Sequence, residues 1–347
     1  MVTVDWRVRR SESRPQMPSR ARSFGTALIT LIVLHPFNLA ASEATVVAEI
    51  ERHAEAQGVR VGVSALHLPS GRRVQMNASE DFPLASTYKV PMAAYALHLV
   101  AEGELTLDQL IEVRQEDLVI SSPITRLFPH PGIQLSLLNL MEATLIQSDN
   151  TATDVLLRTI GGGEAVTAWL KASGIDGMRV DRNTADLIRD YMEIPRTDGA
   201  MAAQYEALDF DHLNEADWAG FYDALLADPR DQGTPDAMVT LLAGLWQDAY
   251  LDAAHGETLR GIMARCLTGS ARLSGRMPDQ QLPLAHKTGT LGGTVNDVGV
   301  ITLPDDRGTL VIAVYTRAES TFDAEAGERT IAEVSRTLYD YFLFSEE

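Results

Sequence analysis

The chain has 347 residues, of which 45% are hydrophobic and 22% are charged. This composition fits an ordinary soluble globular protein with one large domain or two lobes. The formal charge is −19, and no basic stripe interleaved with aromatic residues offsets it. We therefore expect neither a nucleic-acid partner nor attraction to an anionic membrane surface.

The first 41 residues have the composition of an export signal. Six arginines against two acidic residues give this segment a net charge of +4, and an apolar run over 24–34 follows them. Small residues at Ala40, Ala41 and Ser42 suit signal cleavage. The apolar run is too short for a membrane span, although a basic tail followed by a core strand is an alternative. We predict a signal peptide over 1–41, and a mature product, 42–347, that is periplasmic or secreted and free of the membrane.

Cys266 is the only cysteine, so the chain can form no internal disulfide. It sits in an apolar helical pattern with Leu259, Ile262 and Met263, which predicts a buried and inert thiol. Acidic residues and His212 flank another predicted helix near Asn214, and we interpret them as its solvated side rather than as metal ligands. We therefore expect no metal and no cofactor.

In chain order, the spacing of apolar residues predicts a helix over 42–57 and two strands over 59–68 and 72–76. Helical spacing then predominates from 87 to about 266, and the piece over 175–233 is less regular. The last elements return to strands and end in a helix: 282–290, 296–303, 309–316 and 324–342.

This order of elements predicts an α+β fold. Five strands from both ends of the chain would form one antiparallel sheet flanked by helices, beside a helical insertion lobe. We place the α/β lobe at 42–80 plus 270–347 and the all-α lobe at 81–269.

A short stretch over 84–91 joins a nucleophile to a possible base. Ser86 is followed three residues later by Lys89, at the start of an apolar run over 92–100. Positions i and i+3 share a helix face, so the spacing places the ammonium beside the hydroxyl. Lysine can accept the serine proton only if burial and nearby cations lower its pKa. Alone, the pair would more often be solvated helix surface, so the rest of the chain decides its meaning.

Two further motifs follow in order, one between two predicted helices and one on a predicted strand: Ser148-Asp149-Asn150 and Lys287-Thr288-Gly289. These three motifs together are the signature of class A β-lactamases and penicillin-binding proteins. Residues 287–297 and Thr234-Pro235 are similar as well. Over 44–342 the chain resembles the class A serine β-lactamase family, including its serine β-lactamase/DD-peptidase-like fold.

The resemblance implies a role for each motif. Ser86 would be acylated, with Lys89 as acceptor or relay of its proton. Ser148, between the two lysine heads, would pass a proton to the leaving nitrogen. The backbone N–H groups of Ser86 and Thr290 would form the oxyanion hole. Asn150 would hold Lys89 and a substrate amide. The substrate carboxylate would be bound by Lys287, Thr288, Gly289 and Thr290.

The chain departs from the family over 180–188, the stretch that matches the family loop with the deacylating glutamate. Thr184 stands where a glutamate activates the deacylating water, and Ile188 stands where an asparagine belongs. Asp186, Glu193 or neutral Lys89 could supply a base instead. We therefore expect acylation to outrun deacylation. Arg317 is a candidate for an arginine that assists the substrate carboxylate.

Three hypotheses follow from these motifs. The first is an exported β-lactamase that hydrolyses the β-lactam ring through a Ser86 acyl-enzyme. The alternative is a D-alanyl-D-alanine peptidase or transpeptidase-like enzyme, or a slowly deacylating β-lactam binder. The third is a sensor that stays acylated, which would need a signalling partner or an anchoring segment. We expect a monomer whose partner is a small-molecule β-lactam or a wall peptide.

Overall fold

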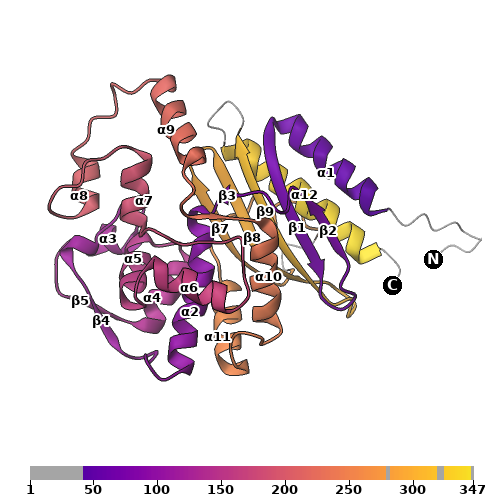
Figure 1. The fold of residues 1–347 in the computed structure, drawn as a ribbon, viewed down its shortest axis with the longest axis horizontal. Helices are drawn as coiled ribbons and strands as arrows, with labels where there is room; N and C mark the ends of the chain where they lie inside the picture. Colours follow the sequence, from indigo (N-terminus) through magenta and orange to yellow (C-terminus); the bar gives the residue numbers. More distant parts are fainter. Residues whose placement is uncertain (1–41, 279–281, 319–323, 345–347) are drawn as a thin grey trace, which may run out of the picture. The chain divides into compact units, whose positions relative to one another are not determined.

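A five-stranded antiparallel sheet forms the centre of the described fold. The computed structural model describes residues 42–278, 282–318 and 324–344, so the predicted export signal lies outside the described residues. The strands lie in the order β2-β1-β9-β8-β7, which joins both ends of the chain as the sequence predicted (Figure 1). Their bounds are β1 Val59–His67, β2 Arg73–Met76, β7 Leu284–Leu291, β8 Thr294–Thr302 and β9 Thr309–Ala318.

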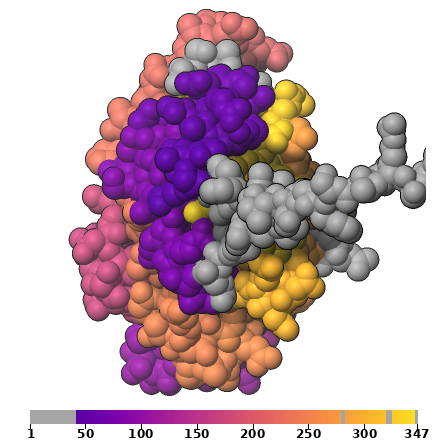
Figure 2. All heavy atoms as spheres, turned by 90° about the vertical axis from the view of Figure 1, so that its right-hand side faces the viewer, coloured from indigo at the N-terminus to yellow at the C-terminus, as the bar shows by residue number. Residues whose placement is uncertain are grey.

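The sheet is covered on both faces, and β9 shows why. Successive side chains of a strand point to opposite faces. Ile312 and Val314 enter a core with helices α1 (Glu43–Gln57) and α12 (Ala324–Phe344), whereas Val311, Ala313 and Tyr315 enter a second core shared with the other helices. Figure 2 shows the indigo start of the described chain beside its yellow end on the α1–α12 side. A strand buried on both faces must be apolar almost throughout, as β9 is.

The remaining helices lie between the first and last strands of the sequence. Helix α2 is central among them, because nine of its 13 residues are buried. Helix α10 contacts β1 and β9. Their bounds are α2 Lys89–Ala101, α3 Pro123–Leu127, α4 Leu137–Ile146, α5 Asn150–Thr159, α6 Gly163–Ala172, α7 Thr184–Tyr191, α8 Met201–Glu206, α9 Glu215–Ala227, α10 Pro235–Trp246 and α11 Ala253–Met263; the 3-10 helices are η1 Ala85–Tyr88 and η2 Gln115–Asp117.

Two small ladders correct the prediction that 87–266 is helical apart from loops. Strand β4 (Leu110–Val113) pairs with β5 (Ile133–Ser136), and β3 (Phe82–Pro83) pairs with β6 (Gln232–Gly233). Each strand has two to four residues. Such short strands depend on a partner far away in the sequence, so local periodicity carries no sign of them.

The segment between α6 and α10 is more ordered than its irregular sequence suggested. It contains α7 and α8 as well as the helix α9 that Asn214 caps. Helix α9 reaches the turn between β7 and β8, where a side chain on Gly292 or Gly293 would collide with the Tyr222 ring. The long segment therefore packs against the end of the strand that carries the third motif.

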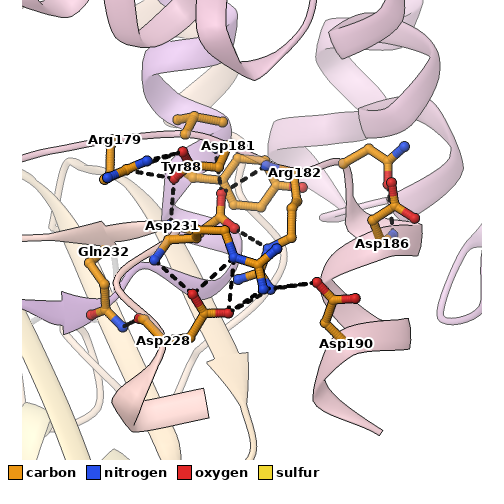
Figure 3. Close-up of polar contacts among 12 residues, drawn as sticks. Tyr88, Arg179, Asp181, Arg182, Asp186, Asp190, Asp228, Asp231 and Gln232 are labelled. Carbon is orange, nitrogen blue, oxygen red and sulfur yellow. Dashed lines mark hydrogen bonds and ion pairs between the residues drawn. The ribbon is translucent and has the colours of Figure 1, made fainter. Parts of the chain in front are cut away.

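A cluster of ion pairs joins the two ends of this segment (Figure 3). Arg182 is 8% exposed, and its Nε lies 2.6 Å from Asp231 Oδ2. Its Nη1 lies 3.0 Å from Asp190 and 2.9 Å from Asp228. Arg230 also bonds to Asp228 and lowers the pKa of that carboxyl to about 2. Arg182 precedes α7, whereas Asp228 and Asp231 follow α9. The cluster therefore holds the two ends of the segment together.

We predict that Arg182→Ala destabilises the protein by about 3–5 kcal/mol, because it leaves buried carboxylates without their cation. The matched control is Arg196→Ala, which removes a 59% exposed side chain paired with Asp190 at 2.7 Å. An exposed pair contributes at most about 1 kcal/mol. Urea unfolding at neutral pH measures both losses, and equal losses would contradict a structural role for the buried cluster.

Candidate active site

Ser86 lies on the four-residue turn η1, directly before α2. The preceding residue, Ala85, has φ 45°, a left-handed conformation that costs energy in a residue with a side chain. Asn296 Nδ2 donates to the carbonyls of Pro83 and Leu84 at 2.9 and 3.2 Å, which fastens the chain before the turn to β8. The half-buried serine is thus held on a strained, well-anchored turn.

Lys89 is fully buried, and its ammonium is directed at the second motif. Its Nζ lies 2.8 Å from Ser148 O, 3.2 Å from Ser148 Oγ and 2.8 Å from Asn150 Oδ1. Ser148 and Asn150 therefore provide acceptors for all three N–H donors of an ammonium at this position. In the sequence, Lys89 follows Ser86 by three residues, about one helical turn. Burial lowers the pKa of Lys89 well below its usual value, and the charge of Lys287 lowers it further.

The Ser148 hydroxyl lies between two lysines. Lys287 Nζ donates to Ser148 Oγ at 2.9 Å and to Thr288 O at 2.7 Å. Burial lowers the pKa of Lys287 to about 8. Ser148 itself has φ 58°, which turns both its carbonyl and its hydroxyl toward Lys89. An oxygen that accepts from two ammonium groups must direct its own proton elsewhere, so it can donate to a third group.

The third motif brings β7 close to the Ser86 turn. A Cβ on Gly289 would lie 2.8 Å from Leu84 O and 3.1 Å from Ser86 N, so only glycine allows this approach. Thr288 Oγ1 lies 2.6 Å from Thr268 Oγ1. The backbone N–H groups of Ser86 and β7 can therefore face a common space beside the serine.

Arg272 is a site residue that the sequence reasoning missed. It is 6% exposed, and its Nη2 donates to Thr290 Oγ1 at 2.7 Å. Its Nη1 donates to Gly289 O at 3.0 Å. Arg317, which the sequence suggested for this place, instead lies over the Phe82 ring, 5.3 Å from its centroid. Arg272 stands between helical and strand patterns, where no periodicity marks it.

Asp149, the middle residue of the second motif, is structural. Its carboxylate accepts from Ser122 Oγ at 2.7 Å, Ile124 N at 2.8 Å and Ala152 N at 2.8 Å. These bonds fasten the start of α3 to the start of α5. Asn150 bridges the same region, because its Nδ2 donates to Ile120 O at 3.0 Å while its Oδ1 holds Lys89.

Of the two acids suggested as substitutes for the missing glutamate, Asp186 forms ion pairs and Glu193 lines an open hollow. Asp186 pairs with Arg189 and Arg196 at 3.5 and 3.3 Å. Glu193 lines an open hollow with those same arginines. Two buried acids, Asp154 and Asp149, act on the charge of Lys89. Asp154 is 7% exposed and is hydrogen-bonded to the start of α7.

Cys266 lies outside the helix in which the sequence placed it, because α11 ends at Met263. Burial raises the pKa of the thiol, but a hydrogen bond from His286 and the charge of Lys287 lower it more, to about 7. His286 is held in turn by Asp297, 2.9 Å from its Nδ1. The half-buried thiol is therefore more acidic than an inert one.

No group of three or more His, Cys, Asp and Glu side chains in the described parts of the chain is placed to hold a metal ion. Within the same parts, no helix is both long and apolar enough to cross a membrane.

Comparisons with known proteins agree with the three motifs. A family model described as the beta-lactamase enzyme family matches residues 44–342. An imipenem-hydrolyzing beta-lactamase of Enterobacter cloacae is 31% identical, over 81% of this chain and 84% of that protein. Beta-lactamase VEB-1 of Pseudomonas aeruginosa is 29% identical, over 85% of this chain and 89% of that protein.

Solved structures extend the similarity to the fold. An ancestral class A beta-lactamase superposes with a TM-score of 0.69 at 32% identity, over 84% of this chain and 98% of that one. A beta-lactamase from Chitinophaga pinensis gives a TM-score of 0.69 at 28% identity, over 85% and 98%. The motifs, the sheet and these matches together show that the chain belongs to the class A serine β-lactamase family.

Proposed function

We propose that this protein hydrolyses the ring amide of β-lactams through an acyl-enzyme on Ser86. The observation that carries the proposal is the Ser148 hydroxyl, which lies 3.2 Å from one buried lysine and 2.9 Å from another, beside the Ser86 turn. This arrangement supplies a nucleophile, a proton carrier and two buried lysines within one site.

Acylation begins when Ser86 Oγ attacks the ring carbonyl. Its proton goes to Lys89, which burial and Lys287 favour in the neutral form. The backbone N–H groups of Ser86 and Thr290 stabilise the oxyanion, since the absence of a side chain on Gly289 lets β7 approach the turn. The ring C–N bond then breaks as Ser148 passes its proton to the leaving nitrogen and recovers one from Lys89.

Recognition of the substrate centres on its carboxylate. Lys287 supplies an ammonium, and Thr288 and Thr290 supply hydroxyls on the same strand. Arg272 donates to Thr290 Oγ1, which leaves the threonine proton free to point at the carboxylate. Asn150 would keep its second amide N–H for a substrate oxygen. No cofactor takes part in this scheme.

The wall-peptide alternative is not favoured, because the relatives that match over most of the chain are named β-lactamases.

The export of the protein and its division into lobes belong to the same proposal. We propose that residues 1–41 direct export to the periplasm or the medium and are removed. The product, a monomer, would consist of an α/β lobe (42–80 and 270–347) and an all-α lobe (81–269).

We predict that Ser86→Ala abolishes covalent labelling by a fluorescent penicillin without changing the circular dichroism spectrum. The matched control is Ser136→Ala, which removes another serine at a helix start but one followed by Asn139 rather than by lysine. That variant should lose only about 1 kcal/mol of stability and label normally. Labelling of the Ser86 variant at wild-type stoichiometry would refute the assignment.

Lys287→Ala should weaken transition-state binding by about 2–4 kcal/mol, because the substrate carboxylate loses its cation. Esterifying that carboxylate should cost the wild type about as much and the variant little. The control is Lys171→Ala, which removes an exposed lysine on α6. Steady-state kcat/KM on acid and ester substrates gives the comparison, and equal losses on esterification would exclude Lys287 as the reader of the carboxylate.

The pH profile should follow the same lysine. Burial lowers the pKa of Lys287 to about 8, so its cation is present below that pH and disappears as the pH rises through it. We expect kcat/KM for a carboxylate substrate to fall above about pH 8, since this ratio reports the free enzyme. The ester should show no such fall. A fall of equal size for both substrates would point to a different titrating group.

A further inference from the structure

The buried carboxylate of Asp154 is hydrogen-bonded to the residue that stands where the family has its glutamate. Asp154 lies on α5 one turn after Asn150, the residue that holds Lys89. Its Oδ1 accepts from Thr184 N at 2.7 Å and its Oδ2 from Ala185 N at 2.9 Å. The Thr184 hydroxyl also lies close enough to this carboxyl to lower its pKa. Thr184 is the residue that replaces the glutamate.

A second contact connects Thr184 to the nucleophile turn. Tyr88 Oη lies 2.7 Å from Thr184 Oγ1, and Tyr88 is two residues from Ser86 on η1. These three side chains are at least nine-tenths buried. A chain of polar contacts therefore runs from Tyr88 on the Ser86 turn through Thr184 to Asp154, whose carboxyl also interacts electrostatically with Lys89.

The two ends of this chain fix the direction of its hydrogen bonds. Burial and the nearby Asp154 raise the pKa of Tyr88 well above its usual value, so its phenol keeps its proton and donates. Asp154 accepts when it is ionised. Thr184 must then accept from Tyr88 and donate to Asp154, which leaves its oxygen one lone pair free for a further donor such as water.

We infer that Asp154, acting through the Thr184 hydroxyl, accepts the proton of the water that releases the acyl group from Ser86. This inference rests on the proposed function. The water oxygen bonds to the acyl carbon as a water proton passes to Thr184 Oγ1 and the threonine proton passes to Asp154. The bond from the carbon to Ser86 Oγ then breaks, and that oxygen recovers the proton by the reverse path.

The charges around Asp154 suit this task. Burial raises its pKa to about 6, against the lowering effects of the Ala185 and Thr184 hydrogen bonds and of Lys89. Lys89 is the titratable group whose charge acts on it from α2, Tyr88 lies nearby as a neutral phenol, and α7 contributes the Thr184 hydroxyl and two backbone N–H groups. Asp154 is thus ionised at neutral pH yet more basic than an exposed aspartate.

A role confined to anchoring α7 would need only the two backbone hydrogen bonds. Thr184→Val separates the two roles, because it removes the hydroxyl and leaves both N–H donors to Asp154. Thr184→Val is made alone and also in combination with Tyr88→Phe. The double variant is needed because the single one leaves the buried Tyr88 hydroxyl without its partner. Asp154→Asn removes the base directly. The controls are Asp186→Asn and Glu193→Gln.

The experiment acylates each protein with a penicillin and follows the loss of the Ser86 adduct by mass spectrometry. We expect Thr184→Val, the double variant and Asp154→Asn to acylate but to deacylate about 10²–10⁴-fold more slowly. Both controls should keep the wild-type rate. Wild-type deacylation should fall roughly tenfold per pH unit below about pH 6, and the Thr184→Val rate should be independent of pH there.

Two results would overturn the role of Asp154 and leave the proposed function standing. One is deacylation of the Thr184→Val variants at the wild-type rate, and the other is a rate of the wild-type protein that does not change between about pH 5 and 7. If Asp154→Asn does not fold, the Thr184→Val pair still decides, since the anchoring bonds remain. A wild-type protein that never forms the Ser86 adduct would overturn the proposed function and this inference with it.

Discussion

The site depends on one constraint, the need to satisfy the buried ammonium of Lys89. An ammonium removed from water is strongly destabilising unless each of its donors finds an acceptor. Ser148 and Asn150 supply all three acceptors, and the Ser148 hydroxyl also accepts a hydrogen bond from Lys287. Three segments that are distant in the sequence, at the starts of α2 and α5 and on β7, are thereby held at one point. Burial at this point, with the charge of Lys287, also lowers the pKa of Lys89.

Backbone strain and close approach complete the arrangement. Ala85 and Ser148 are two of the nine described residues other than glycine with a left-handed backbone conformation, and these two lie at the proposed site. Such conformations persist only where the surroundings over-determine them. Here Asn296 fastens the chain before Ser86 to β8, and Gly289 allows β7 to approach it. Ser86, the proposed nucleophile, is therefore placed by the sheet on one side and by the helices on the other.

Much of this could be predicted from the sequence, and the failures have physical causes. The five strands and α1 followed from local sequence patterns, which are helical in α1 and apolar almost throughout in β9. The three motifs identified the central groups, because each lies in a short contiguous stretch. Asp154 and Arg272 escaped notice, since their importance comes from partners about 30 residues away and 18 residues away, Thr184 and Thr290. Long-range pairing leaves no local pattern.

The choice between the two basic side chains has a further consequence. The chain contains three lysines among its 29 basic residues, and two of them are the buried Lys89 and Lys287. Surface ion pairs are made by arginine, whose guanidinium does not deprotonate in proteins. An ammonium thus occurs chiefly where a change of charge is useful. In a spectrum of isotope-labelled lysine side chains, only Lys171 would accompany the two site residues, so their titration would be visible almost without overlap.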